Sequence, residues 1–214
     1  MSTTPTKMYY ETLANTVIKN LEKRQMEGYY CSTVEEAEKK VFSFLTDNCA
    51  VSFGGSMTLE DTGLLTALRH DPSIRLIDRA TAKDAAETKK LFHEALSADY
   101  YLMSSNAITT AGELVNIDGT GNRVAALIYG PENVIVLAGM NKISANVDEA
   151  LSRVHNVASP INAMRLNRKT PCAATGSCAD CLSPDCICNQ VVITRRSGIK
   201  GRIKVILIGE EYGY

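Results

Sequence analysis

The sequence predicts an α/β fold with a mainly parallel, Rossmann-like sheet flanked by helices. Short apolar runs alternate with amphipathic stretches of helical periodicity, and several of the apolar runs end in glycine or serine. Alternation of this kind is typical of βαβ units. The apolar fraction of 45% and the charged fraction of 22% are those of a globular protein, and 214 residues fit one domain, 1–214.

The N-terminal part, residues 6–46, is expected to form two helices. Thr33 and Glu36 have the spacing of a capping box and open the second helix, while Gly28 ends the first. Apolar side chains at helical spacing mark the first helix: Met8, Leu13, Val17 and Leu21.

The alternation then continues along the chain. Strands are expected at 49–55, 73–78, 99–105 and 133–139, with a further apolar run at 113–117. Helices are expected at 57–68, 81–97, 121–130 and 147–157. After Pro160 the pattern lapses, and two strand-like runs, 190–196 and 204–210, follow a cysteine-rich loop. We expect these two strands to form a hairpin or an edge ribbon that closes the sheet.

Charge and hydropathy limit the partners that the chain is expected to have. The net charge of −1 gives no electrostatic reason to expect nucleic acid or a membrane surface. The basic clusters at 165–169 and 194–204 are interpreted as solvated faces. No secretory signal is visible, and no apolar run approaches the roughly 20 residues that cross a bilayer. We therefore expect a cytoplasmic protein with reduced thiols.

The stretch FGGSMT, residues 53–58, is a first candidate site for an anion. It follows a predicted strand, where parallel α/β sheets bind their ligands. Gly54 and Gly55 allow close backbone approach, and Ser56 and Thr58 supply hydroxyl groups at the start of a helix. The alternative is a tight turn in which Ser56 or Thr58 caps the helix.

A second candidate site lies within residues 106–131, where polar side chains gather around glycines. The turn DGTGN, residues 118–122, places another helix N-terminus where an anion could bind. Glu113 is the best carboxylate candidate for acid–base or nucleophilic chemistry. The alternative is a hairpin with solvated polar residues. The candidate ligand-binding residues of this region, with one lysine further along, are Asn106, Asn116, Asp118, Gly119, Thr120, Gly121, Asn122, Arg123 and Lys142.

Five of the seven cysteines lie in the loop 170–190, with the spacing C-x5-C-x2-C-x4-C-x-C. Four of them would suffice for zinc or a [4Fe–4S] cluster. Reduced thiols with a structural or redox role, and disulfides, are the other two interpretations. The cysteines concerned are Cys172, Cys178, Cys181, Cys186 and Cys188.

Four motifs in order along nearly the whole chain resemble the LUD-domain family, whose members are commonly labelled lactate-utilisation proteins. The motifs are FGGSMT, NAITTAGELVNIDGTGNRVAA, GPENVIVLAGMNKI and TPCAATGSCADC. The resemblance implies a fold of the NagB/RpiA/CoA-transferase group and a role in the metabolism of organic acids such as lactate. It also implies a homodimer and an association with iron–sulfur oxidoreductase subunits.

A more distant likeness links NAITTAGELVNIDGT to methylthioribose-1-phosphate isomerases and related initiation-factor subunits. Gly112, Asn116 and Gly119–Thr120 match, but Asn106 stands where the isomerases have a catalytic aspartate. An amide cannot act as a general acid or base. CoA transfer would require a glutamate nucleophile, for which Glu113 is the candidate.

Three functions therefore follow from the sequence. The first is an enzyme, or enzyme component, that binds a small anionic metabolite at the two strand-end loops. The second is a non-catalytic regulatory or partner subunit of an iron–sulfur oxidoreductase. The third is a redox module that binds iron–sulfur or zinc through the cysteine-rich loop.

Overall fold

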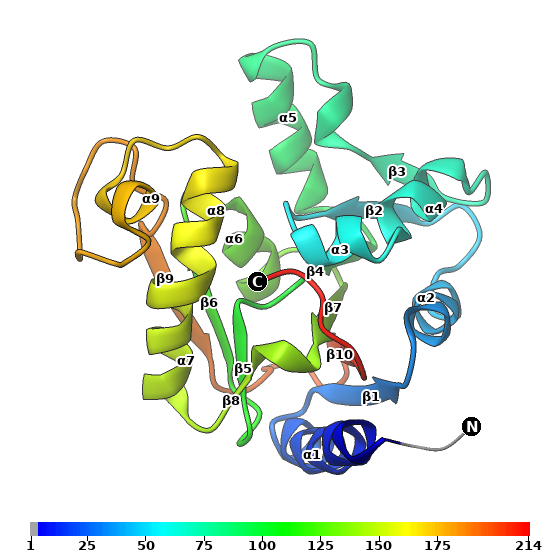
Figure 1. Cartoon of the computed structure of the whole chain (residues 1–214). Helices are drawn as coiled ribbons and strands as arrows, with labels where there is room; N and C mark the ends of the chain where they lie inside the picture. Colours follow the sequence, from blue (N-terminus) through cyan, green and yellow to red (C-terminus); the bar gives the residue numbers. More distant parts are fainter. Residues whose placement is uncertain (1–3) are drawn as a thin grey trace.

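The computed structural model describes residues 4–214 and contains a six-stranded parallel sheet (Figure 1). Its strands lie in the order β1 (Glu27–Cys31), β10 (Ile203–Ile208), β7 (Asn133–Gly139), β4 (Tyr100–Met103), β2 (Ala50–Phe53) and β3 (Arg75–Ile77). Every neighbouring pair is parallel. The predicted fold class is confirmed.

Helices cover both faces of this sheet. One face packs against α1 (Pro5–Lys23), α5 (Ala85–Ala95) and α6 (Asn122–Ile128), and the other against α2 (Val34–Phe42), α3 (Met57–Asp61) and α4 (Leu64–His70). Successive side chains of a strand point to opposite faces, so Val134 and Val136 join the first core and Ile135 and Leu137 the second. Each such buried side chain contributes about 1.5–3 kcal/mol.

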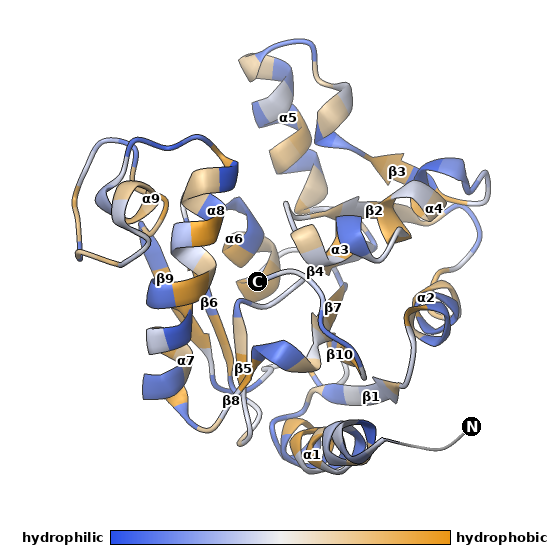
Figure 2. Ribbon diagram, viewed as in Figure 1, coloured by the Kyte–Doolittle hydropathy of each residue, from blue (hydrophilic) through white to orange (hydrophobic). Residues whose placement is uncertain are grey.

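The distribution of hydropathy follows this layering. In Figure 2 the strands are largely hydrophobic, whereas the helices mix hydrophobic and hydrophilic residues along their length. That mixture is expected of helices with one face on a core and the other in solvent. Within residues 4–214, no helix has both the length and the apolar character that a membrane crossing requires.

A second, mixed sheet of four strands lies beside the first. Its order is β8 (Ile143–Ser144), β5 (Ala107–Thr109), β6 (Leu114–Asp118) and β9 (Gln190–Thr194), and only β5 and β8 are parallel. Its apolar core forms with α7 (Val147–Arg153) and the π-helical turn Val154–Ala158. The turn leads into α8 (Ser159–Arg165), and the short helix α9 (Pro171–Thr175) begins the cysteine-rich loop.

The N-terminal region contains the two expected helices, α1 and α2, and also a strand that the sequence pattern did not predict. Strand β1 begins just before Gly28, which we interpreted only as the end of a helix. A Cβ at Gly28 would lie 2.9 Å from Cγ1 of Ile18, so this glycine allows α1 to pack closely on the strand. Strand β1 pairs only with β10, at the opposite end of the chain, and local sequence carries no sign of that pairing.

The predicted closing hairpin is wrong. Strand β9 pairs antiparallel with β6 in the small sheet, while β10 lies inside the six-stranded sheet between β1 and β7. A strand covered on both faces needs a continuous apolar run, which explains IKVILI. The expected helix 57–68 is also divided into α3 and α4, because Gly63 adopts a left-handed conformation with φ of 74°.

Candidate functional site

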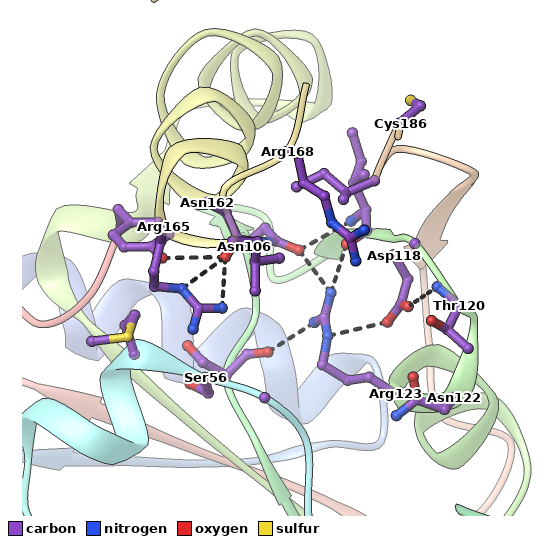
Figure 3. Close-up of a pocket in the computed structure, with 18 of the residues that line it drawn as sticks. Ser56, Asn106, Asp118, Thr120, Asn122, Arg123, Asn162, Arg165, Arg168 and Cys186 are labelled. Carbon is purple, nitrogen blue, oxygen red and sulfur yellow. Dashed lines mark hydrogen bonds and ion pairs between the residues drawn. The ribbon is translucent and has the colours of Figure 1, made fainter. Parts of the chain in front are cut away.

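A cavity of about 460 Å³ lies at the carboxyl ends of β2 and β4, against the small sheet and α8 (Figure 3). This is the edge of a parallel sheet where ligands bind in α/β proteins. Its walls come from five segments and three single residues. The segments are Gly55–Met57, Ser104–Asn106, Ile117–Arg123 without Gly121, the α8 region with Asn162, Arg165, Leu166 and Arg168, and the loop Pro184–Ile187; the single residues are Arg79, Lys142 and Tyr214.

Arg123 lies buried at the base of the cavity and organises its floor. Its guanidinium donates to Oδ1 of Asn116 at 2.6 Å and to Oδ1 of Asn106 at 2.9 Å. It also donates to the carbonyls of Ser104 at 3.1 Å and Ile117 at 2.7 Å. Burial lowers the pKa of Arg123, and the Asp118 carboxylate opposes that effect. Arg123 thereby ties β4, β5 and β6 together.

Asp118 occupies the position where the sequence suggested that an external anion would bind. Its Oδ1 accepts the backbone N–H groups of Thr120 at 3.2 Å and Gly121 at 2.8 Å, and its Oδ2 lies 3.3 Å from Nε of Arg123. The turn DGTGN is therefore filled by the protein's own carboxylate. Gly121 has a φ of 90° there, which a residue with a side chain rarely adopts.

The turn FGGSMT agrees in part with the alternative interpretation, a tight turn in which a hydroxyl group caps the following helix. Ser56 caps α3 by accepting the N–H of Leu59 at 3.3 Å, and it also lines the cavity. The two glycines allow arginine side chains to approach the backbone. A Cβ at Gly54 would lie 3.0 Å from Cδ of Arg123, and one at Gly55 would lie 2.4 Å from Nη2 of Arg79.

Three further arginines line the cavity, and within residues 4–214 none of them forms an ion pair. Arg79 follows β3, Arg165 is the last residue of α8, and Arg168 lies three residues beyond it. The Arg165 guanidinium is held by Oδ1 of Asn162, with Nη2 at 2.8 Å (Figure 3). Guanidinium groups without a carboxylate partner are the form in which proteins present charge to a carboxylate or phosphate.

Lys142 completes the basic set at the end of β7, in a 3-10 turn (Met140–Lys142). Its side chain is buried, and Nζ donates to Oγ1 of Thr58 at 2.8 Å and to Oγ of Ser104 at 3.1 Å. Burial, followed by the nearby charges of Arg153 and Arg123, lowers the pKa of Lys142 to about 7.

The structure brings most of the predicted ligand-binding residues to this cavity. Gly55, Ser56, Asn106, Asp118, Gly119, Thr120, Asn122, Arg123 and Lys142 line it. The other four lie immediately behind the wall. Thr58 contacts Lys142, Asn116 contacts Arg123, Gly54 packs on Arg123, and Gly121 begins α6.

Glu113 is not brought to the cavity. It lies near the turn of the β5–β6 hairpin, where its carboxylate pairs with Arg24, the residue that directly follows α1, and accepts a hydrogen bond from Thr109. At that turn Gly112 contacts the α1 backbone, with a φ of 87°. The geometry assigns Glu113 to the docking of α1 on the hairpin.

The cysteine-rich loop contributes Cys186 to the rim of the cavity. All seven cysteines are free thiols, and within residues 4–214 no three His, Cys, Asp or Glu side chains form a group that could hold a metal ion. The thiols contact neighbouring polar groups: Cys178 lies 3.5 Å from Nδ1 of His155, and Cys188 lies 3.4 Å from Oγ of Ser159. Metal binding by this loop stays a prediction.

Sequence reasoning missed Arg79, Arg165 and Arg168. Arg165 and Arg168 belong to the cluster RLNRK, which we interpreted as a solvated face; both are exposed and also reach the mouth of the cavity. A basic cluster after the last predicted helix of an α/β protein was the available signal. No such sequence signal marked Arg79, which follows a three-residue strand.

Fold and cavity together define an α/β protein with a basic pocket at its strand ends. The chain belongs to the LUD-domain family, whose model matches residues 14–208. No curated protein is similar enough to count as a match.

The chain is similar to several solved structures, of which the first described here supports the fold. A DUF162 family protein from Deinococcus radiodurans superposes with a TM-score of 0.53 at 14% identity, covering 93% of this chain and 98% of that one. eIF2B delta from Chaetomium thermophilum has a TM-score of 0.35 at 18% identity, covering 67% of this chain and 55% of that one. Ribose 5 phosphate isomerase A from Neisseria gonorrhoeae has a TM-score of 0.34 at 15% identity, covering 54% of this chain and 56% of that one.

Proposed function

We propose that this LUD-domain protein binds a small anionic metabolite, an organic acid or a phosphorylated compound, in the cavity at its strand ends. The observation that carries the proposal is the set of three arginines without ion-pair partners among residues 4–214: Arg79, Arg165 and Arg168. The family's association with lactate and related acids agrees with a carboxylate-bearing ligand.

The balance of charge in the cavity favours an anion with more than one negative charge. Five basic side chains line it, against the two carboxylates of Asp118 and Asp185. Both carboxylates have internal partners, because Asp118 pairs with Arg123 and Asp185 accepts the backbone N–H of Lys169 at 2.9 Å. The remaining positive charge would be offset best by a dianion or trianion.

The dimensions of the cavity are consistent with a metabolite. Its volume of about 460 Å³ lies within the usual range for sites that hold small molecules. Serine hydroxyls and asparagine amides on its wall would supply hydrogen bonds to the neutral part of the ligand. A ligand of a few to about a dozen heavy atoms fits this description better than a nucleotide cofactor or an acyl-CoA.

Thermal denaturation with a panel of anions tests the proposal. We expect citrate, malate and small sugar phosphates to raise the melting temperature more than L-lactate or chloride, and the effect to weaken with added salt. A panel in which no anion raises it at millimolar concentration would contradict the proposal.

Matched variants locate the effect. Arg165→Gln and Arg168→Gln should each lower the affinity for the best anion roughly 10- to 100-fold, because a charge-assisted hydrogen bond contributes about 1.5–3 kcal/mol. Arg196→Gln makes the same charge change on the exposed segment after β9, away from the cavity, and should leave affinity unchanged. Equal losses in all three variants would indicate a general charge effect and no defined site.

The role as a partner subunit of an iron–sulfur oxidoreductase is a separate proposal, motivated by the family alone. Recovery of a stable complex from native extract would support it. Turnover of a metabolite by the isolated protein would instead favour an enzyme.

A further inference from the structure

Lys142 is a buried cation without a counter-ion. Its side chain is only 3% exposed, and within residues 4–214 no carboxylate lies within ion-pair distance of its Nζ. Nevertheless it lines the cavity, and its two hydrogen-bond partners, Thr58 and Ser104, are neutral hydroxyl groups. A lysine placed only for stability would be expected to pair with a carboxylate or to extend into solvent.

The hydroxyl groups around Nζ are oriented by other bonds. Thr58 donates its hydroxyl hydrogen to the carbonyl of Tyr212 at 3.3 Å, and Ser104 donates its own to the carbonyl of Ser105 at 3.3 Å. Each hydroxyl oxygen therefore accepts a hydrogen bond from Lys142. A neutral amine has two N–H groups and one lone pair. With both N–H groups donated to Thr58 and Ser104, the lone pair takes no part in these hydrogen bonds.

The charged groups that face Lys142 favour its neutral form. Arg153 on α7 and Arg123 on α6 are both basic, and both act with burial to bring the pKa of Lys142 to about 7, while Asp61 on α3 opposes them. The phenols of Tyr212 and Tyr214, on the C-terminal segment, stay neutral because burial raises the pKa of each. Desolvation beside another cation is how proteins activate a lysine as a nucleophile.

The other ionisable groups on the wall are committed to internal bonds or cannot lose a proton near neutral pH. Asp118 and Asp185 have the partners described above, and arginines stay protonated. Cys186 lies at the rim, and Figure 3 shows its sulfur turned away from Arg123 and the floor of the cavity. Lys142 is the group at the base of the cavity that can exchange a proton near pH 7.

We propose that Lys142 is an imine-forming nucleophile and that the bound anion carries an aldehyde or ketone group, such as a 2-oxo acid or a small sugar phosphate. This inference rests on the anion-binding function proposed above. The amine nitrogen of Lys142 adds to the carbonyl carbon, the two amine hydrogens leave with the carbonyl oxygen as water, and the resulting imine takes up one proton from the solvent. The arginines hold the anionic end, and Lys142 at the base of the cavity reaches the carbonyl.

Reductive trapping tests this chemistry. The protein is incubated with pyruvate, glyoxylate or glycolaldehyde phosphate in the presence of sodium cyanoborohydride, which delivers hydride to an imine and leaves a stable secondary amine. Peptide mapping by mass spectrometry should find the adduct on Lys142, with the exposed Lys169 and Lys200 of the same chain at background. The yield at Lys142 should fall about tenfold per pH unit well below pH 7, where the amine is protonated.

Two variants keep the test decisive. Lys142→Arg preserves positive charge and cannot form an imine, and Lys142→Met removes the charge. Both should lose the adduct. If anions bind wild-type protein but Lys142 carries no adduct above the exposed lysines, the imine inference is wrong and the anion site stands. If Lys142 is trapped but no non-carbonyl anion stabilises the protein, the amine is reactive and the anion-binding proposal fails.

Discussion

Asp118 and Arg123 hold each other inside the turn that the sequence suggested as an anion site, with Oδ2 of Asp118 3.3 Å from Nε of Arg123. The remaining guanidinium N–H groups of Arg123 bind carbonyl and amide oxygens of the strands beside it. Arg123 is therefore a structural arginine at the floor of the cavity, and the arginines available to a ligand are Arg79, Arg165 and Arg168.

This assignment predicts that Arg123→Gln destabilises the protein by roughly 3–5 kcal/mol, because Asp118 and several buried acceptors lose their partner at once. Urea denaturation measures the change. Arg168→Gln, which removes an exposed guanidinium without an ion pair among residues 4–214, should alter the unfolding free energy by less than about 0.5 kcal/mol. Similar losses of unfolding free energy in Arg123→Gln and Arg168→Gln would show that the hydrogen bonds of Arg123 do not stabilise the floor of the cavity.

Glu113→Gln should reduce stability and leave anion binding intact. Its carboxylate pairs with Arg24 in a partly buried contact, with side-chain exposures of 20% for Arg24 and 16% for Glu113. Losing that charge is expected to cost about 1–3 kcal/mol. Glu94→Gln is the matched control, because its ion pair with Arg75 is largely exposed and should contribute less than about 1 kcal/mol. A large fall in anion affinity in Glu113→Gln would instead support the catalytic role expected from sequence.

Lys142 predicts a particular dependence of stability on pH. Its pKa is about 7 in the folded protein, against 10.5 for an unperturbed lysine, so between these values the unfolded chain binds more protons. The contribution of Lys142 to the free energy of unfolding should therefore rise with pH between about 7 and 10.5, by at most about 1.4 kcal/mol per pH unit. Lys142→Met should remove this rise. The same slope in wild type and variant between pH 7 and 9 would contradict the prediction.

The thiols of the cysteine-rich loop should differ in reactivity. Hydrogen bonds from Ser183 lower the pKa of Cys181, whereas burial raises the pKa of Cys188 to about 11. Because the thiolate is the reactive form, iodoacetamide at neutral pH should modify Cys181 faster than Cys188. Mass spectrometry of timed samples measures the order, and denaturant should abolish it. Faster reaction of Cys188 than of Cys181 in the native protein would contradict this account of the loop.

The same experiment bears on metal binding. If the loop holds iron–sulfur or zinc, protein purified without oxygen should contain the metal, and its loop thiols should resist iodoacetamide until a chelator is added. Cys181→Ser should then lose the metal, whereas Cys49→Ser, at a buried thiol far from the loop in sequence, should keep it. If the protein is metal-free and its loop thiols react freely, the interpretation of the loop as a set of reduced cysteines is supported.

The parallel sheet could be predicted because the burial of its strands is visible in their own apolar sequence. Runs such as VIVLAG, residues 134–139, are apolar throughout, since both faces of the strand are covered. Strand β1 could not be predicted in the same way. Its half-buried residues, EGYYC, lack a clear period, and its partner β10 lies near the other end of the chain. The position of β10 within the sheet likewise depends on long-range pairing, which local patterns do not record.

The candidate site was predictable where a turn follows a strand, and not where a side chain reaches it from elsewhere. Glycines and hydroxyl residues mark FGGSMT directly. In contrast, Asp118 binding the N–H groups of its own turn, and Arg165 reaching the cavity from α8, follow from packing that sequence spacing does not encode. The burial of Lys142 between Thr58 and Ser104 also follows from packing and could not be predicted from sequence spacing.

The structure of the protein with a bound multivalent anion tests the central claim most directly. Crystals grown with citrate or a sugar phosphate should show the anion's oxygens within hydrogen-bonding distance of at least two of Arg79, Arg165 and Arg168, with its remainder directed toward Lys142. An anion bound at saturating concentration anywhere else, with these three guanidiniums still free, would contradict the assignment of this cavity as the functional site.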